Sequence, residues 1–218
     1  MKKFERLHSI AVPLDRSNID TDAILPGRFL KTIQRTGLGR YLFYGWRFDQ
    51  DGRPVLDFEL NRPCYAGARI LIAADNFGCG SSREHAVWAL MDYGFDVVIA
   101  ESFGDIFRNN SLKNGLLPVA LPRDDVATLR RLAEGGRTEL EVDLESCLVR
   151  APGGVSFRFE VPEFARQCLL NGWDEIAVTE QRYLDQITAY ERRRAHELPW
   201  LFPDLRERAA EEPAAARR

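Results

Sequence analysis

The chain has 218 residues, 45% of them hydrophobic, so it is long enough to bury a core of its own as one domain or at most two small ones. Its 30 lysines and arginines nearly balance its 33 aspartates and glutamates, which leaves a net charge of −3. This balance excludes the broad electropositive field that drives nucleic-acid binding, so we expect no nucleic-acid partner.

The N-terminal segment MKKFERLHSIAVPLD is charged at its start and shows no apolar run of a signal peptide before Asp15. No stretch elsewhere reaches the ~18 consecutive apolar residues of a membrane span. We therefore expect a cytoplasmic protein that makes no membrane contact.

Cysteines and histidines are scattered along the chain with no spacing typical of metal ligands. They are Cys64, Cys79, Cys147, Cys168, His8, His85 and His196. We expect reduced thiols, as is usual in the cytosol, and no metal ion bound by this chain alone.

Residues 15–67 are rich in turn formers and aromatic side chains, as in DTDAILPGRFL and TGLGRYLFYGWRFDQDG. This composition predicts short strands joined by long loops. An apolar strand over 69–73, a helix over 82–93 and a second buried strand over 96–100 are expected next. Residues 69–100 thus predict a strand, a glycine-rich loop, a helix and a strand.

The same order repeats more weakly further along the chain. Residues 105–114 are expected to form a helix that Gly115 closes, and an apolar strand follows over 116–121. Strands that alternate with helices in this way predict an α/β fold.

The second half of the chain mixes both kinds of element. We expect helices over 124–134, 162–170 and 179–194, and antiparallel strands over 139–143, 147–150 and 155–160 around GG and PGG turns. The sheet should therefore be mixed, with flanking helices. We assign residues 1–202 to one domain and 203–218 to a charged, alanine-rich tail that is too poor in apolar residues to order itself.

The most informative segment is DNFGCGSSREHA, residues 75–86. Gly78 and Gly80 allow unusual backbone dihedrals just before the expected helix. Free N–H groups at a helix start form a natural anion site. A purely structural alternative exists, because Ser81 and Glu84 have the spacing of a capping box.

Three features exceed what a cap requires, namely the second hydroxyl of Ser82, the thiol of Cys79 and an arginine at position 83. A cation near a helix N-terminus opposes the helix dipole by about 0.3 to 1 kcal/mol, so Arg83 suggests an anionic ligand. Its planar guanidinium suits a carboxylate. We therefore expect this loop to bind a carboxylate while Ser81, as an alkoxide, removes the neighbouring proton.

The segment FGCGSSREHA at 77–86 resembles the serine loop of the swivelling domain of the aconitase superfamily. Further segments resemble the small subunits of bacterial isopropylmalate dehydratases in the same order. They are NIDTDAILPGRFLKT at 18–32, GLGRYLFYGWRFDQDG at 37–52, DYGFDVVIAESFGDIF at 92–107, NNSLKNGLLPV at 109–119 and YERRRAHELPWL at 190–201. The resemblance covers nearly all of residues 5–202.

This resemblance implies a swivelling β/β/α domain and specific roles for residues of the chain. Ser81 would be the catalytic base, Ser82 and Arg83 would bind the substrate carboxylate, and Asp22 would be an active-site aspartate that also binds substrate. A loop of four residues would discriminate between substrates: Phe29, Leu30, Lys31 and Thr32.

The implied reaction converts 2-isopropylmalate to 3-isopropylmalate through 2-isopropylmaleate, a step of leucine biosynthesis. The resemblance places a [4Fe–4S] cluster on a separate large subunit. This chain would form a heterodimer or larger assembly with that subunit and would be inactive without it. Three alternatives differ in function. The first is a sister hydro-lyase that acts on homoaconitate, citraconate or a methylated malate, and the second is a non-catalytic anion-binding domain. The third is a serine hydrolase, which the absence of a GxSxG elbow disfavours.

Other candidate residues receive structural interpretations. His85 is expected to pack or bond locally, and Cys79 to be a small buried residue without a histidine partner. Of Asp20 and Asp22, one should lie in the site and the other should cap a turn. The aromatic residues Tyr41, Phe43, Tyr44, Trp46 and Phe48 are expected in the core or at an interface with another protein chain.

Overall fold

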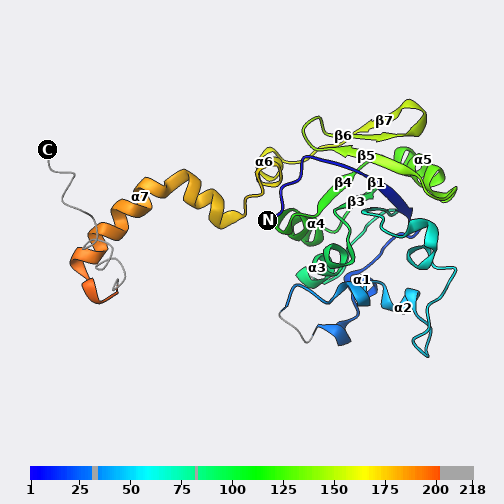
Figure 1. The fold of residues 1–218 in the computed structure, drawn as a ribbon, viewed down its shortest axis with the longest axis horizontal. Coiled ribbons are helices and arrows are strands. Elements are labelled where there is room, and N and C mark those ends of the chain that lie inside the picture. The colour runs from blue at the N-terminus through cyan, green and yellow to red at the C-terminus, as the bar shows by residue number, and fades with distance from the viewer. Residues whose placement is uncertain (31–33, 82, 202–218) are drawn as a thin grey trace. The chain divides into compact units, whose positions relative to one another are not determined.

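The computed structural model describes residues 1–30, 34–81 and 83–201 (Figure 1). The chain forms two compact units, Met1–Asp174 and Glu175–Arg218. The predictions for Lys31, Thr32, Ser82 and the tail at 203–218 lie outside the described residues. No helix in the described part of the chain is long and apolar enough to cross a membrane.

The first unit is built on a seven-stranded sheet with the order β4-β3-β2-β1-β5-β6-β7. The strands are β1 Arg6–Pro13, β2 Ile70–Ile72, β3 Val97–Ala100, β4 Leu117–Ala120, β5 Glu139–Asp143, β6 Leu148–Ala151 and β7 Val155–Arg158. From β1 to β4 neighbouring strands are parallel, whereas β1, β5, β6 and β7 pair antiparallel. The predicted mixed α/β sheet is therefore confirmed.

Helices flank this sheet. In the first unit they are α1 Thr21–Ile24, α2 Tyr44–Arg47, α3 Glu84–Tyr93, α4 Asp105–Asn114, α5 Arg123–Glu134 and α6 Glu163–Asn171. The second unit holds α7 Glu175–Glu197 and the 3₁₀ turn η6 Pro199–Leu201. The predicted helix that Gly115 closes is confirmed as α4, because Gly115 takes a left-handed conformation with φ of 96°.

The prediction of short strands between residues 15 and 67 is wrong. The described residues there form α1, α2 and four 3₁₀ turns: η1 Gly27–Phe29, η2 Gly39–Tyr41, η3 Glu59–Asn61 and η4 Pro63–Tyr65. Aromatic residues favour strands only when a neighbouring strand supplies partners. Here they anchor turns in the core instead.

Strand β1 is central to the sheet, yet its residues were not predicted to form a strand. It alternates between exposed and buried residues only from Arg6 to Ser9 and is buried from Ile10 to Pro13. Residues Arg6 to Ile10 pair with β5, and Ala11 to Pro13 pair with β2. A strand that changes its surroundings midway lacks a clean period of two, which weakens the pattern used to recognise strands.

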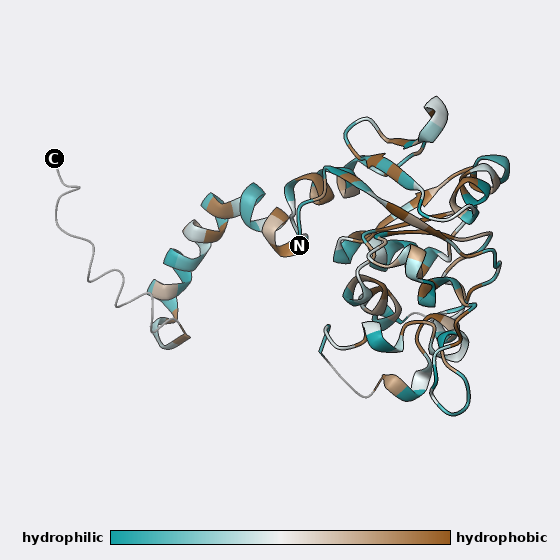
Figure 2. Ribbon diagram, turned by 45° about the vertical axis from the view of Figure 1, so that its right-hand side comes forward, coloured by the Kyte–Doolittle hydropathy of each residue, from teal (hydrophilic) through white to brown (hydrophobic). Residues whose placement is uncertain are grey.

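Two apolar clusters lie on opposite faces of the sheet. Leu71 and Val98 point into one cluster, which includes Ala86 and Leu90 of α3, whereas Ile70 and Ile72 point into the other. Figure 2 shows these strands as a hydrophobic centre. Because β2 ends at Ile72 and α3 begins at Glu84, the glycine-rich loop lies at the carboxyl edge of the parallel strands, the usual location of ligand sites in open α/β sheets.

Candidate active site

The loop at 75–83, here called the serine loop, is bonded on one side to residues 18–21. The Gly78 N–H donates to the carbonyl of Ile19 at 2.7 Å, and the Thr21 N–H donates to the carbonyl of Cys79 at 3.0 Å. The buried Thr21 also donates its hydroxyl to the carbonyl of Ser81 at 3.3 Å. The segment that carries Asp22 and the segment that carries Ser81 are thus held together by these hydrogen bonds.

On its other side the serine loop is bonded to residues 102–104. The Phe77 N–H donates to the carbonyl of Ser102 at 3.0 Å, and the Gly104 N–H donates to the carbonyl of Phe77 at 2.9 Å. The Ser102 hydroxyl donates to Oδ1 of Asp75 at 2.6 Å. Contacts on both sides fix the path of the loop ahead of α3.

Both glycines of the loop adopt the left-handed dihedrals that the sequence predicts, with φ of 74° at Gly78 and 88° at Gly80. They differ in their surroundings. A Cβ on Gly78 would collide with the ring of Phe107, whereas a Cβ on Gly80 would lie 3.5 Å from Cβ of Asp20. Gly78 is therefore required for space as well as for conformation.

The capping-box alternative for Ser81 is wrong. Helix α3 begins at Glu84, and its N-cap is Arg83, which makes no side-chain capping bond. The carboxylate of Glu84 instead accepts a hydrogen bond from Nδ2 of Asn114 at 2.7 Å. Ser81 lies two residues before the cap and is an exposed residue of the loop.

Arg83 and Asp22 form an ion pair between guanidinium Nη1 and carboxylate Oδ1. Neighbouring Asp20 caps α1, because its Oδ1 accepts a hydrogen bond from the Ala23 N–H at 2.6 Å. The expectation that one of the two aspartates caps a turn is confirmed for Asp20. Asp22 instead pairs with the arginine of the serine loop, and its place in an active site stays a prediction.

Gly27 also lies at this pair, although it was not among the site residues expected from the sequence. A Cβ built on it would lie 3.5 Å from Arg83 Nη1 and 3.5 Å from Asp22 Oδ1. The only local signal is the Pro-Gly dipeptide at 26–27, which predicts a turn without indicating what the turn contacts.

The two described residues of the expected discriminating loop, Phe29 and Leu30, are half-buried and pack against the apolar cluster that contains α3. Phe29 stacks on Tyr41, with ring centroids 4.0 Å apart. Phe43 is fully buried and stacks on Trp46. The expectation of a core role for the aromatic cluster is confirmed for Phe43.

His85 packs on the ring of Trp88, with ring centroids 4.6 Å apart, as expected for a local role. Cys79 is half-buried between the two glycines of the loop. Among the described residues, no three histidine, cysteine, aspartate or glutamate side chains gather as a metal site.

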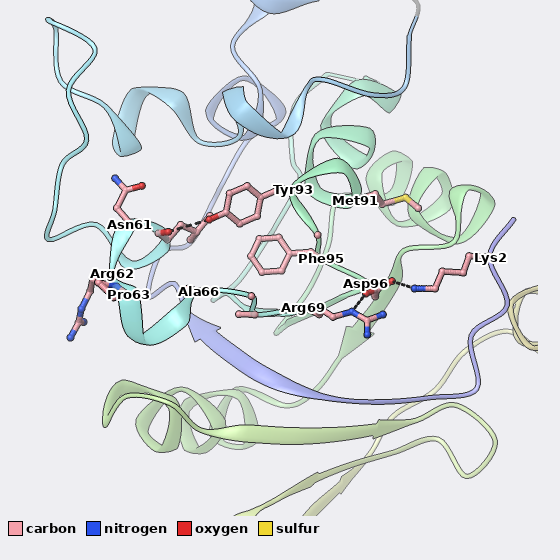
Figure 3. Close-up of a pocket in the computed structure, with 14 residues that line it drawn as sticks. Lys2, Asn61, Arg62, Pro63, Ala66, Arg69, Met91, Tyr93, Phe95 and Asp96 are labelled. Carbon is pink, nitrogen blue, oxygen red and sulfur yellow. Dashed lines mark hydrogen bonds and ion pairs between the residues drawn. The ribbon is translucent and has the colours of Figure 1, made fainter.

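A hollow of about 760 Å³ lies away from the serine loop (Figure 3). Arg69 and Asp96, which line it, immediately precede β2 and β3, so it opens at the amino edge of the parallel strands. Arg69 Nε and Asp96 Oδ2 are 2.5 Å apart, and Lys2 Nζ lies 3.4 Å from Asp96 Oδ1. None of the expected site residues in the described part of the chain lines this hollow, so its size does not make it the candidate active site.

Comparison with known proteins identifies the family along most of the chain. Residues 1–124 match the aconitase C-terminal domain, and residues 127–163 match the family described as LeuD_N. Residues 182–204 match the C-terminal domain of the 3-isopropylmalate dehydratase small subunit.

Individual proteins agree with these family models. The 3-isopropylmalate dehydratase small subunit of Rhodospirillum centenum is 54% identical over 201 residues, which cover 92% of this chain and 98% of that protein. The small subunit of Neisseria meningitidis is 49% identical, covering 93% of this chain and 99% of that protein. A crystal structure of 3-isopropylmalate dehydratase from Methanocaldococcus jannaschii superposes with a TM-score of 0.64 at 26% identity, covering 84% of this chain and 99% of that one.

The aligned relatives span nearly the whole chain at identities well above the level at which a fold and a family are shared. The chain therefore belongs to the family of 3-isopropylmalate dehydratase small subunits within the aconitase superfamily.

Proposed function

We propose that this chain, together with a partner large subunit, interconverts 2-isopropylmalate and 3-isopropylmalate through 2-isopropylmaleate in leucine biosynthesis. The observation that carries the proposal is the meeting of Arg83, Asp22 and the exposed serine loop at the carboxyl edge of the sheet. We place this activity in the cytoplasm.

Arg83 and Ser82 bind one substrate carboxylate. A guanidinium offers two parallel N–H donors to a carboxylate, and such charge-assisted bonds are stronger than neutral ones. Asp22 holds the guanidinium through Nη1, so that its orientation is set before substrate arrives. Asp22 is in this way a positioning residue for Arg83.

Ser81, as an alkoxide, removes the proton from the carbon next to the bound carboxylate. The electrons of the broken C–H bond form the carbon–carbon double bond, and the hydroxyl leaves from the adjacent carbon. Negative charge that develops on the carboxylate is stabilised by Arg83. Addition of water in the opposite orientation returns the proton through Ser81 and places the hydroxyl on the other carbon.

The start of α3 contributes only part of the stabilisation of the Ser81 alkoxide. A helix N-terminus supplies up to about 2 kcal/mol in favourable geometry, which corresponds to about one and a half pKa units. The positive charge of Arg83, the exclusion of water and groups from the large subunit must provide the remainder.

We assign the [4Fe–4S] cluster to the large subunit, where it would supply Lewis-acid stabilisation of the departing hydroxyl. The contribution of this chain is therefore the base and the carboxylate site. We propose that the turn carrying Phe29 and Leu30, with Lys31 and Thr32, discriminates between substrates by the group on the carbon that bears the isopropyl side chain.

The test measures the hydration of 2-isopropylmaleate. This chain is mixed anaerobically with a cluster-loaded large subunit, and the reaction is monitored by the loss of 2-isopropylmaleate absorbance. The wild-type chain should support hydration, and Ser81→Ala should reduce kcat by at least about a thousandfold, the scale of losing an essential base together with its activation. Turnover of homoaconitate or citraconate but not of 2-isopropylmaleate would reassign the chain to a sister hydro-lyase. Full activity of Ser81→Ala would remove Ser81 as the base.

A further inference from the structure

The 3₁₀ turn η1, Gly27–Phe29, forms one side of the carboxylate site. The backbone of Gly27 lies so close to the Arg83–Asp22 pair that an added Cβ would reach van der Waals contact with both partners, at 3.5 Å. A displacement of this turn would therefore change the space around the guanidinium. The position of the turn matters to any ligand that Arg83 binds.

Aromatic rings hold the turn in place. Phe29, its last residue, stacks on Tyr41 with ring centroids 4.0 Å apart and planes 9° apart. Its ring also meets Tyr44 at 5.0 Å, and the guanidinium of Arg28 lies 4.9 Å from the rings of both Phe29 and Tyr44. The turn is thus attached to residues 41–44 by stacking and cation–π contacts.

The segment that carries these tyrosines is fixed in the core. Leu42 and Phe43, between Tyr41 and Tyr44, are fully buried. The Phe43 N–H donates to the carbonyl of Ile24 at 2.9 Å, and Ile24 ends the helix that carries Asp22. The tyrosines therefore belong to the same rigid framework as one partner of the ion pair.

Phe29 borders two hollows. It lines a hollow of about 540 Å³ together with Tyr44, and a second hollow of about 350 Å³ together with Tyr41. The ring is half-buried against the apolar cluster that contains α3, and its stacking on Tyr41 adds a second contact that holds it in place.

We propose that Tyr41 and Tyr44 are positioning residues for substrate recognition, which hold turn η1 through Phe29 and thereby fix the wall that Gly27 forms beside Arg83. This inference rests on the proposed function, because it takes Arg83 to be the ligand of the substrate carboxylate. The tyrosines act on binding and leave the proton transfer by Ser81 unchanged.

The first experiment compares Tyr41→Leu with Tyr41→Phe in the full chain assembled with the large subunit. An aromatic pair contributes about 0.5 to 1.5 kcal/mol beyond burial, so Tyr41→Leu should raise KM for 2-isopropylmaleate about two- to tenfold. Its kcat should change by less than about twofold. Tyr41→Phe retains the ring and should keep the wild-type KM. A fall in kcat at unchanged KM would show a merely structural role and overturn the inference.

The second experiment needs no catalysis. In the free chain, the Phe29 N–H donates to the carbonyl of Pro26 at 2.9 Å, and the Leu30 N–H donates to that of Gly27 at 3.2 Å. Both amides should exchange with solvent about tenfold faster in Tyr41→Leu, while the amide of Val98 in β3 keeps its protection. Unchanged exchange at Phe29 and Leu30 would contradict the anchoring.

The two experiments separate the possible failures. Faster exchange with no turnover by the wild-type assembly would overturn the proposed function and leave the anchoring of the turn intact. Faster exchange with a wild-type KM in Tyr41→Leu would overturn the link from the turn to substrate recognition while the proposed function stands.

Discussion

Arg83 and Asp22, 61 positions apart in the chain, form an ion pair beside the serine loop. The side chain of Asp22 is 55% exposed and that of Arg83 is 32% exposed. Exposed pairs of this kind contribute only about 0 to 1 kcal/mol to folding. The pair therefore matters for how it presents the guanidinium rather than for the stability of the fold.

Replacing Arg83 by lysine should weaken substrate binding without destabilising the chain. Lysine keeps the charge but loses the planar pair of donors, and bonds to charged groups contribute about 1.5 to 3 kcal/mol. We expect kcat/KM for 2-isopropylmaleate to fall about ten- to a hundredfold, with Tm within a few degrees of wild type. Arg53→Lys, at a 77% exposed surface pair, is the matched control and should leave both quantities unchanged. A wild-type kcat/KM in Arg83→Lys would exclude bidentate recognition.

Replacement by alanine should destabilise the chain at Asp20 but not at Ser81. Asp20 caps α1, so Asp20→Ala should lower the free energy of unfolding by about 1 kcal/mol. Ser81 caps no helix, so Ser81→Ala should change it by less than about 0.5 kcal/mol. Urea denaturation of both variants measures the difference. A loss of stability in Ser81→Ala as large as that in Asp20→Ala would restore its role as a cap.

Gly78 and Gly80 form a matched pair that separates steric from conformational effects. Both have positive φ, so alanine at either position costs about 1 to 2 kcal/mol. At Gly78 the new Cβ also collides with Phe107, which adds about 1 to 3 kcal/mol. Gly78→Ala should therefore unfold at clearly lower denaturant than Gly80→Ala. Equal midpoints would mean that the ring of Phe107 moves away without cost.

Acidification should weaken the sheet through Asp143. The N–H of Ser146 donates to its Oδ1 at 3.0 Å, and the guanidinium of Arg6 lies 2.9 Å from its Oδ2. The Ser146 backbone bond, followed by the Ser146 side chain and the charge of Arg6, holds the pKa of the Asp143 carboxyl below its usual value.

Since the folded pKa of Asp143 is depressed, its contribution to stability is fully present above the unfolded value of about 3.9 and is lost as pH falls through the folded pKa. Asp143→Asn should therefore be less stable than wild type at pH 7, by about 1.5 to 3 kcal/mol, with the difference shrinking below about pH 4. Denaturation at pH 7 and pH 3 checks this. If the stability difference between Asp143→Asn and wild type is the same at both pH values, the carboxylate charge is excluded as its cause. Asp51→Asn on the exposed loop provides the control.

The local features of this protein could be predicted from sequence to the extent that they depend on neighbouring residues. The strand at Glu139–Asp143 and the end of α4 at Gly115 follow from side-chain periodicity and from the dihedral freedom of glycine. Helix α3 begins at Glu84 rather than at the predicted residue 82, and in the loop before it Phe77, Gly78 and Cys79 form hydrogen bonds with residues 18–21 and 102–104, which the sequence pattern does not reveal.

By itself the sequence determined the α/β class, the positive φ of Gly78 and Gly80 and the residue types of the serine loop, since each depends on a short stretch of chain. Only the tertiary structure decided that Asp22 meets Arg83, that Gly27 lies beside both and that Phe29 stacks on Tyr41. The contacts of Asp22 and Gly27 with Arg83 join segments that are remote along the chain. They depend on the order of the strands and on hydrogen bonds between loops, which local propensity does not encode.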